Sequence, residues 1–197
     1  MTAGLPAIFV RLTGCDLRCT WCDTRYAGEG GKDIDIEEIV HLVSGFKIPR
    51  VVITGGEPLI QGETLELISK LADNDYKVFL ETSGAHDIGE VDKRATVRLD
   101  FKPPSSGMTE KMRWDNVGKL KSSDETKIAI ADETDYKWAC EIMGKYDLTS
   151  ICPVNFTPVT ESIDPALLAK WIVSDALNVR LNIQLHKIIW GVEAEGV

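Results

Sequence analysis

Short apolar runs rich in β-branched residues alternate along the chain with segments of helical periodicity. Seven such runs are typical of buried strands and lie at residues 7–12, 50–54, 77–82, 96–101, 126–131, 150–156 and 179–185. Apolar residues spaced three and four apart predict helices at 35–46, 63–75, 134–146 and 164–177. Strand and helix therefore alternate about six times, and right-handed crossovers between such strands build a parallel sheet.

The length of the chain limits how far such a sheet can close. With 197 residues, 44% of them hydrophobic, the chain can bury one substantial core. It is nevertheless too short for a complete eight-unit barrel. No repeat, low-complexity tract or linker divides the sequence. We therefore predict an α/β fold, a partial (β/α)6 barrel with a parallel sheet, formed by a single domain over residues 1–197.

Polar and glycine-rich segments follow the first four predicted strands. They are a loop with three cysteines (residues 14–24), TGGEP (54–58), ETSG (81–84) and DFKPPSSG (100–107). Parallel α/β proteins bind ligands at the carboxyl ends of their strands, where these segments would meet. The sequence therefore predicts the functional site at this end of the sheet.

Charge and the amino terminus limit the classes of partner. The formal net charge is −9, with 22 Lys and Arg against 31 Asp and Glu, so a nucleic-acid backbone would be repelled. The first residues, MTAGLPAIFVRLTG, lack the basic region of a signal peptide, and their apolar run is too short to cross a bilayer. We predict a cytoplasmic protein that binds neither nucleic acid nor membrane.

The loop at residues 14–24 holds Cys15, Cys19 and Cys22. Thiols stay reduced in the cytoplasm, so this grouping favours a metal or redox role over a disulfide, and thiolates suit zinc or an iron–sulfur cluster. A structural zinc site needs four protein ligands, and the nearest histidine, His41, lies in a predicted helix. A 4Fe–4S cluster on three cysteines keeps one iron open for a small molecule. The spacing by itself leaves both possibilities open.

The cysteine segment, CDLRCTWC, resembles the CxxxCxxC signature of radical S-adenosylmethionine (SAM) enzymes, with Trp21 at the aromatic position before the last cysteine. TGGEPL is similar to the GGE motif of that superfamily, which holds the methionine amino group of SAM. The resemblance implies a partial barrel of the radical SAM type that binds a 4Fe–4S cluster through the three cysteines. It also implies SAM contacts from Trp21, Asp23, Gly56, Glu57, Ser83, Asp100, Phe101 and Lys102.

Longer segments, GLPAIFVRLTGCDLRCTWCDT, DFKPPSSG and LNIQLHKIIWG, resemble one family of that superfamily, the 7-carboxy-7-deazaguanine synthases of queuosine and deazapurine biosynthesis. This resemblance implies a radical ring contraction of 6-carboxy-5,6,7,8-tetrahydropterin that expels ammonia, with Mg2+ as a further cofactor. It implies that Thr24 binds the Mg2+ and that Arg11 and Thr54 contact the pterin. It also implies an electron donor such as a flavodoxin or ferredoxin, and a homodimer.

The start of the sequence departs from the family pattern. Members of the family usually begin with an SIQGEG-like segment that contacts the pterin, and we expect this N-terminal substrate segment to be missing here. Two alternatives remain open: an activase of a glycyl-radical enzyme, and a non-catalytic module that binds zinc or a cluster. Gln184, His186 and Lys187 could line the mouth of the site without a catalytic role, and Cys140 and Cys152 are interpreted as ordinary buried residues.

Overall fold

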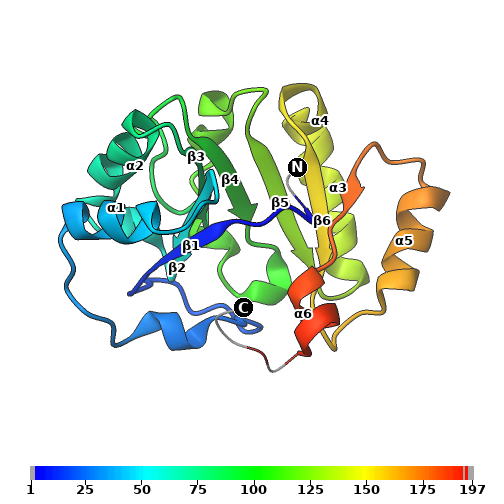
Figure 1. The fold of residues 1–197 in the computed structure, drawn as a ribbon. Coiled ribbons are helices and arrows are strands. Elements are labelled where there is room, and N and C mark those ends of the chain that lie inside the picture. Colours follow the sequence, from blue (N-terminus) through cyan, green and yellow to red (C-terminus); the bar gives the residue numbers. More distant parts are fainter. Residues whose placement is uncertain (1–2, 193, 195–197) are drawn as a thin grey trace.

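The strands join one parallel sheet in the order of the sequence (Figure 1). The computed structural model describes residues 3–192 and residue 194. Its strands are β1 (Ile8–Leu12), β2 (Arg50–Gly55), β3 (Lys77–Thr82), β4 (Thr96–Phe101), β5 (Glu125–Ile130), β6 (Val154–Pro158) and β7 (Arg180–Leu181). Each strand is parallel to its neighbour, and β1 and β7 are the two edges of a curved, unclosed sheet. The predicted partial barrel is thus confirmed.

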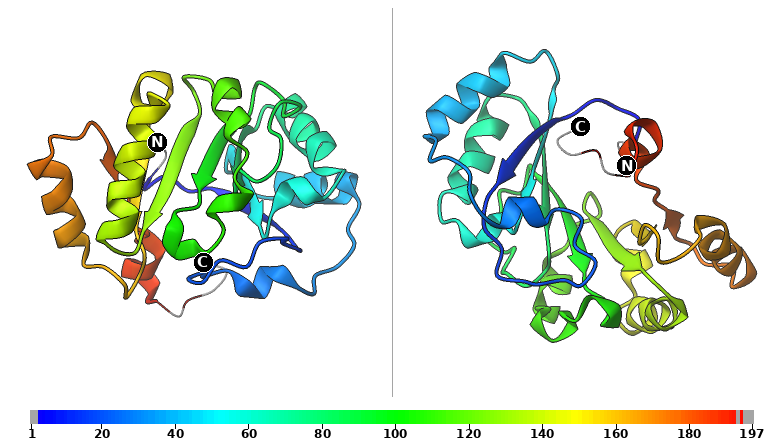
Figure 2. Two further views of the ribbon diagram at one scale, coloured as in Figure 1. Left: turned by 180° about the vertical axis from the view of Figure 1, so that it is seen from behind. Right: turned by 90° about the horizontal axis from the view of Figure 1, so that it is seen from below.

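Helices cover the convex side of the sheet (Figure 2). They are α1 (Ile36–Ser44), α2 (Thr64–Asp73), α3 (Glu133–Lys145), the short α4 (Leu148–Ile151) and α5 (Pro165–Ser174), while α6 (Leu185–Trp190) lies at the open side. Apolar side chains of the sheet, such as Ile53, Leu80 and Ile128, are fully buried beneath these helices and hold the layers together. Within the described residues, no helix is long and apolar enough to cross a membrane.

Two crossovers, at residues 83–95 and 102–124, contain no α-helix, and neither segment carries a helical pattern. The second contains the 3-10 helices η3 (Pro104–Ser106), η4 (Thr109–Lys111) and η5 (Trp114–Lys119). Trp114 stacks on Phe101 and on Tyr146, with ring centroids 5.3 and 5.1 Å apart. Aromatic packing therefore covers this part of the sheet in place of a helix.

The strands predicted at 77–82 and 96–101 are confirmed, and two others need correction. Residues 148–151 form α4, which ends there because Cys152, the residue before Pro153, is held extended. β6 begins only at Val154. In the segment 179–185, Arg180 and Leu181 alone pair with β6, and Leu185 already starts α6. An edge strand has a hydrogen-bonding neighbour on one side only, so its ends leave the sheet easily.

The two faces of the sheet differ because successive side chains of a strand point to opposite sides. The face turned away from the helices carries Thr54, Glu81, Arg98 and Glu125 on four neighbouring strands, with Glu81 opposite Arg98 and Arg98 opposite Glu125 in the register. This polar, concave face lies directly below the loops at the carboxyl ends of the strands. It is therefore suited to a polar ligand.

Candidate active site

The cysteine loop, residues 14–24, leaves the carboxyl end of β1 at the mouth of the concave face. Cys15, Cys19 and Cys22 are free thiols and are half-buried. Burial is the main influence that raises the pKa of Cys15 and of Cys19; the Cys22 thiol raises both pKa values further, and Cys15 also raises that of Cys19. The three sulfurs are thus close enough to repel one another as thiolates, and a cationic metal centre would relieve that repulsion.

A second loop, residues 103–108 after β4, supports the cysteine loop. The Trp21 indole Nε1 donates a hydrogen bond to Ser105 Oγ at 2.8 Å. Ser105 N donates in turn to the buried carboxylate of Asp135, in the first turn of α3, at 3.0 Å. These contacts give the DFKPPSSG segment a physical role, because they tie the cysteine loop to the helix layer.

The glycine pair after β2 lets that strand end directly against the cysteine loop. A Cβ atom at Gly56 would lie 1.9 Å from the carbonyl oxygen of Gly14. A Cβ atom at Gly55, whose φ is +130°, would lie 1.9 Å from the carbonyl oxygen of Leu12. Gly56 N donates to Leu12 O at 3.0 Å, and Glu57 N donates to Gly14 O at 2.8 Å. No side chain fits between the two segments, so glycine is required at both positions.

Glu57 is fully buried and joins the ends of β2 and β3. Its Oε1 accepts hydrogen bonds from Thr82 Oγ1 at 2.8 Å and from Leu59 N at 3.0 Å, and its Oε2 accepts one from Ser83 N at 2.7 Å. The side chain is fully buried and all three of these hydrogen bonds are to the protein, so the carboxylate itself has no open side toward the ammonium of SAM. Backbone carbonyls near Gly56 are the other acceptors that the motif offers, and Glu57 holds them in position.

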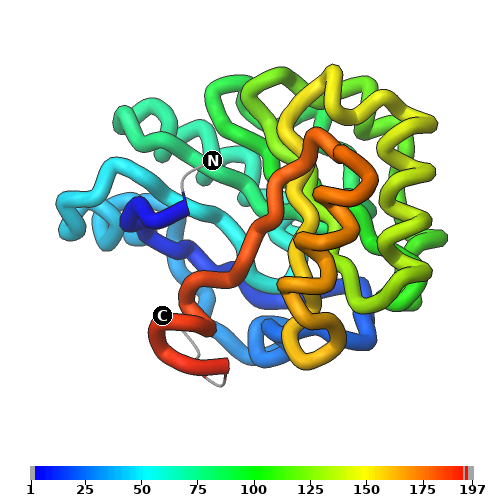
Figure 3. Tube along the Cα trace, turned by 90° about the vertical axis from the view of Figure 1, so that its right-hand side faces the viewer, coloured from blue at the N-terminus to red at the C-terminus, as the bar shows by residue number. Residues whose placement is uncertain are grey.

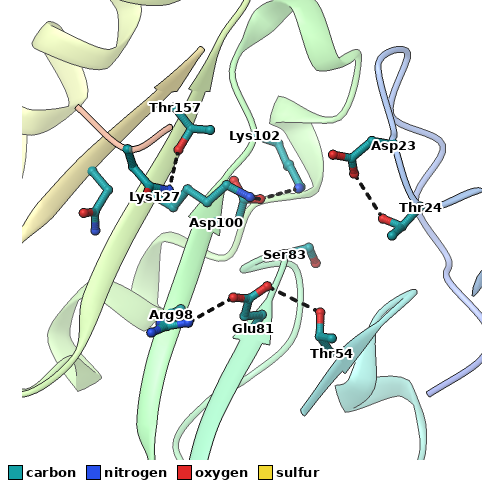
Figure 4. Close-up of polar contacts among 12 residues, drawn as sticks. Asp23, Thr24, Thr54, Glu81, Ser83, Arg98, Asp100, Lys102, Lys127 and Thr157 are labelled. Atoms are coloured by element: carbon teal, nitrogen blue, oxygen red, sulfur yellow. Dashed lines mark hydrogen bonds and ion pairs between the residues drawn. The ribbon is translucent and has the colours of Figure 1, made fainter. Parts of the chain in front are cut away.

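Asp100 and Lys102, at the end of β4, form a charged group that faces the mouth (Figure 4). Asp100 Oδ2 accepts hydrogen bonds from Lys102 Nζ at 2.9 Å and from Lys127 Nζ of β5 at 3.0 Å. Burial opposes the charge of Asp100, but the two lysines lower the pKa of its carboxyl. The Lys102 ammonium also lies 5.6 Å from the centroid of the Trp21 ring. Phe101 points to the opposite face and is fully buried, so its side chain cannot reach a ligand here.

Arg11 and Thr54, the two residues expected to contact substrate, are register neighbours on β1 and β2. The Arg11 guanidinium carbon lies 5.5 Å from the centroid of the Tyr26 ring. Thr54 Oγ1 donates to Glu81 Oε2 at 3.4 Å, and Arg98 Nη1 donates to Glu81 Oε1 at 3.2 Å (Figure 4). The structure thus brings the expected pair together and adds Glu81 and Arg98, of which the polar alternation of β4 could have indicated Arg98.

Asp23 and Thr24 connect the cysteine loop with the segment that follows β7, which runs from the last strand toward the N-terminal part of the chain (Figure 3). Asp23 Oδ2 accepts hydrogen bonds from Gln184 Nε2 at 2.7 Å and from Lys187 Nζ at 3.1 Å. Burial opposes the charge, but these contacts lower the pKa of Asp23 to about 2. Thr24 Oγ1 donates to Asp23 Oδ1 at 3.3 Å and lies 3.9 Å from Cys22 Sγ. The loop is therefore held from the open side of the sheet as well.

The donor set fits a 4Fe–4S cluster better than a single metal ion. A zinc ion gathers its ligands around one point, at about 2.0–2.3 Å. The cysteine loop supplies three thiols, one ligand fewer than the four of a structural zinc site. In a cluster each thiolate binds a different iron, so the cysteines surround a volume instead. Cys15, Cys19 and Cys22 are three thiols of one loop and can supply one ligand to each of three irons.

Comparison with known proteins shows to which class of enzyme this chain belongs. A model of the radical SAM superfamily matches residues 9–99, which include the cysteine loop and the glycine pair. QueE from Escherichia coli shares the fold, with a TM-score of 0.73 and 23% identity over 92% of this chain and 86% of that chain. SuiB from Streptococcus suis, bound to its precursor peptide SuiA, has a TM-score of 0.68 and 15% identity over 93% of this chain and 49% of that chain. The protein is a radical SAM enzyme, a class that uses a 4Fe–4S cluster and SAM.

Curated relatives identify the family of radical SAM enzymes to which the chain belongs. The 7-carboxy-7-deazaguanine synthase of Chlorobaculum tepidum is 42% identical over 99% of this chain and 90% of the relative. The synthase of Thermoplasma acidophilum is 38% identical over 96% of this chain and 90% of the relative. The chain belongs to the 7-carboxy-7-deazaguanine synthase family. The alternatives of a glycyl-radical activase and of a non-catalytic module are therefore set aside.

Proposed function

We propose that the protein converts 6-carboxy-5,6,7,8-tetrahydropterin to 7-carboxy-7-deazaguanine, with loss of ammonia, in queuosine and deazapurine biosynthesis. One observation carries the proposal: a three-cysteine loop lies over a charged concave face in a chain that matches the synthases over nearly all of its length. A pterin that bears a carboxylate is polar at most of its edge, and such a face can supply hydrogen bonds and charges to it.

The chain's own residues would bind and orient the reactants. Cys15, Cys19 and Cys22 would hold the cluster and leave one iron for SAM. When bound, the cluster and SAM supply a radical that can take a hydrogen atom from the substrate. The proposed SAM contacts are the backbone of Gly56 and Phe101 and the side chains of Trp21, Asp23, Ser83, Asp100 and Lys102. Glu57 would not contact SAM through its side chain; it would hold the backbone near Gly56 in position.

We place Mg2+ at Thr24 and the pterin beside Arg11 and Thr54. The Thr24 hydroxyl lies next to the Asp23 carboxylate, and Mg2+ takes hard oxygen ligands together with water and a ligand oxygen. Within residues 3–192, Arg11 forms no ion pair, so its planar guanidinium can pair with a substrate carboxylate. Omission of Mg2+ from the assay should therefore reduce turnover, and T24A should weaken the response to added Mg2+.

The proposal includes a single radical SAM domain over residues 1–197, a cytoplasmic location, a flavodoxin or ferredoxin as electron donor, and a homodimer. Support for the dimer comes from α6, where Leu185, Ile188, Ile189 and Trp190 are 42% to 66% exposed within the described structure. Contact with a second copy would remove this apolar surface from water. Light scattering after size exclusion tests the dimer, and a strictly monomeric peak would contradict it.

Anaerobic turnover of the reconstituted protein tests the function. The assay contains SAM, a reductant, Mg2+ and 6-carboxytetrahydropterin, and mass spectrometry follows 5′-deoxyadenosine and the deazaguanine product. We expect both products from the wild type and neither from C19A, whereas C140A, which changes a cysteine on α3, is the matched control. Formation of 5′-deoxyadenosine without the deazaguanine would contradict the proposed substrate but would remain consistent with a radical SAM enzyme.

A further inference from the structure

Lys127 lies on β5 at the centre of the concave face, opposite Asp100 in the register of β4 and β5. Its ammonium nitrogen is 3.0 Å from Asp100 Oδ2 (Figure 4). The motifs that mark the cysteine loop, the glycine pair and the end of β4 do not include this residue. The function proposed above gives it no role, although it stands among the side chains of the site.

Two lysines share one aspartate at this position. Asp100 Oδ2 also accepts a hydrogen bond from Lys102 Nζ, at 2.9 Å. The three side chains together therefore carry one surplus positive charge. The charge of Asp100 raises the pKa of Lys127 despite the opposing effect of burial, so its ammonium stays protonated.

The other carboxylates that act on Lys127 have cations of their own. Glu81 Oε1 lies 3.2 Å from Arg98 Nη1, and Asp23 Oδ2 lies 3.1 Å from Lys187 Nζ. These pairs leave the surplus charge of the two lysines uncompensated. An anionic group of a ligand can balance it.

The Lys127 side chain is partly buried within the site but remains accessible to a ligand bound there. Its side chain is 37% exposed, against 15% for Asp100 and 12% for Lys102. An ammonium has three hydrogens to donate, and Asp100 Oδ2 takes one of them. Asp100 Oδ1 is buried and has no hydrogen-bond partner within the described structure. The Lys127 ammonium thus offers free donors to a bound molecule.

We infer that Lys127, together with Lys102, binds a carboxylate group of a ligand. The inference rests on the proposed function, in which two molecules bring a carboxylate to the site: SAM and the tetrahydropterin. Asp100 has a positioning role in this arrangement, because it holds both ammonium groups on one side of the ligand. The chemistry is the same for either source, and binding experiments can separate them.

Equilibrium binding to the anaerobic, reconstituted holoenzyme without reductant tests the inference. The probes form two pairs, SAM with decarboxylated SAM, and 6-carboxypterin with pterin. In K127Q we expect the affinity for one carboxylate-bearing probe to fall about tenfold to a hundredfold, the range of a hydrogen bond to a charged group. The probe of that pair without a carboxylate should change by less than about threefold. K127R keeps the charge and should recover part of the loss.

Lys137 provides the matched control. It lies on α3, 68% exposed and 2.7 Å from Glu133, so K137Q removes the same charge from a lysine that also has a carboxylate partner. It should leave all four affinities unchanged. Wild-type protein gives a second test that does not depend on the folding of any variant: at least one probe pair must show tighter binding of the member with the carboxylate.

A selective loss in the SAM pair or in the pterin pair would support the inference and identify the source of the carboxylate. Equal losses of affinity for both members of both pairs would overturn the inference. It would also be overturned if the wild type bound the two members of each pair with equal affinity. Failure of the proposed function is distinguishable, because it would appear as selective SAM binding through Lys127 in an enzyme that forms no deazaguanine.

Discussion

Replacement of Gly56 by alanine tests the close approach of β2 to the cysteine loop. The added Cβ would lie 1.9 Å from the carbonyl oxygen of Gly14, 2.5 Å from its carbonyl carbon and 2.9 Å from Cys15 Cβ. These are backbone atoms and a Cβ atom, none of which can rotate away. The loop or the strand end must therefore move by about 1 Å, since protein interiors leave no room for such overlap.

The magnitude follows from the contacts that this movement disturbs. Overpacking of a close-packed site costs about 1–3 kcal/mol. The hydrogen bonds from Gly56 N to Leu12 O at 3.0 Å and from Glu57 N to Gly14 O at 2.8 Å would weaken as well, and each contributes about 1 kcal/mol. We expect G56A to lower the free energy of unfolding by about 3–5 kcal/mol and the melting temperature by about 10 °C.

Urea unfolding of the reduced apoprotein, followed by circular dichroism, measures this loss, and iron and sulfide analysis after reconstitution shows whether the cysteines still hold a cluster. G62A is the matched control, because its added Cβ has no atom within 4 Å and its φ lies outside the left-handed region. It should change stability by less than about 0.5 kcal/mol. If G56A unfolds like wild type and takes up a full cluster, the close approach is needed neither for stability nor for cluster binding.

Further predictions concern buried groups near and away from the site. E57Q replaces one acceptor oxygen by a donor facing Thr82 or Ser83 and should cost about 1–3 kcal/mol in the same unfolding assay; unchanged stability would contradict the buried network. W21F removes the hydrogen bond to Ser105 and should lower cluster retention at a cost of about 1 kcal/mol, whereas full retention would show that this bond does not hold the loop. Burial raises the pKa of Cys152 to about 11, so at pH 8 iodoacetamide should alkylate it about a hundredfold more slowly than a free cysteine. Peptide mapping of native and unfolded protein measures this rate, and equal labelling of both would contradict it.

Much of the fold was predictable because its strands carry a local signal. β4 alternates polar and apolar residues over its whole length, TVRLDF, since one face meets the helices and the other the site. The ends of the sheet were less predictable. The segment 179–185 alternates like a strand, but pairing stops after two residues, and α4 is too short to show a helical period. In both places the secondary structure depends on contacts with neighbouring elements rather than on the sequence of the segment itself.

The motifs located the site but not the direction of each side chain. Phe101 lies between Asp100 and Lys102 in sequence, so in a strand it must point away from both, and the structure buries it in the core. Glu57 belongs to the motif, yet its carboxylate serves the ends of two strands. The bond from Gln184 to Asp23 spans 161 residues, a separation at which no local pattern could have indicated it.

These contacts all help to order the cysteine loop. An irregular loop that presents three thiols to a cluster must be ordered, and this ordering costs conformational entropy. The loop meets the end of β2 through the backbone hydrogen bond from Glu57 N to Gly14 O, the loop after β4 through Ser105, and the C-terminal segment through Gln184. None of these partners is a cluster ligand. Loss of any one should weaken cluster retention while the three cysteines remain intact, since each offsets part of the cost of holding the thiols in place.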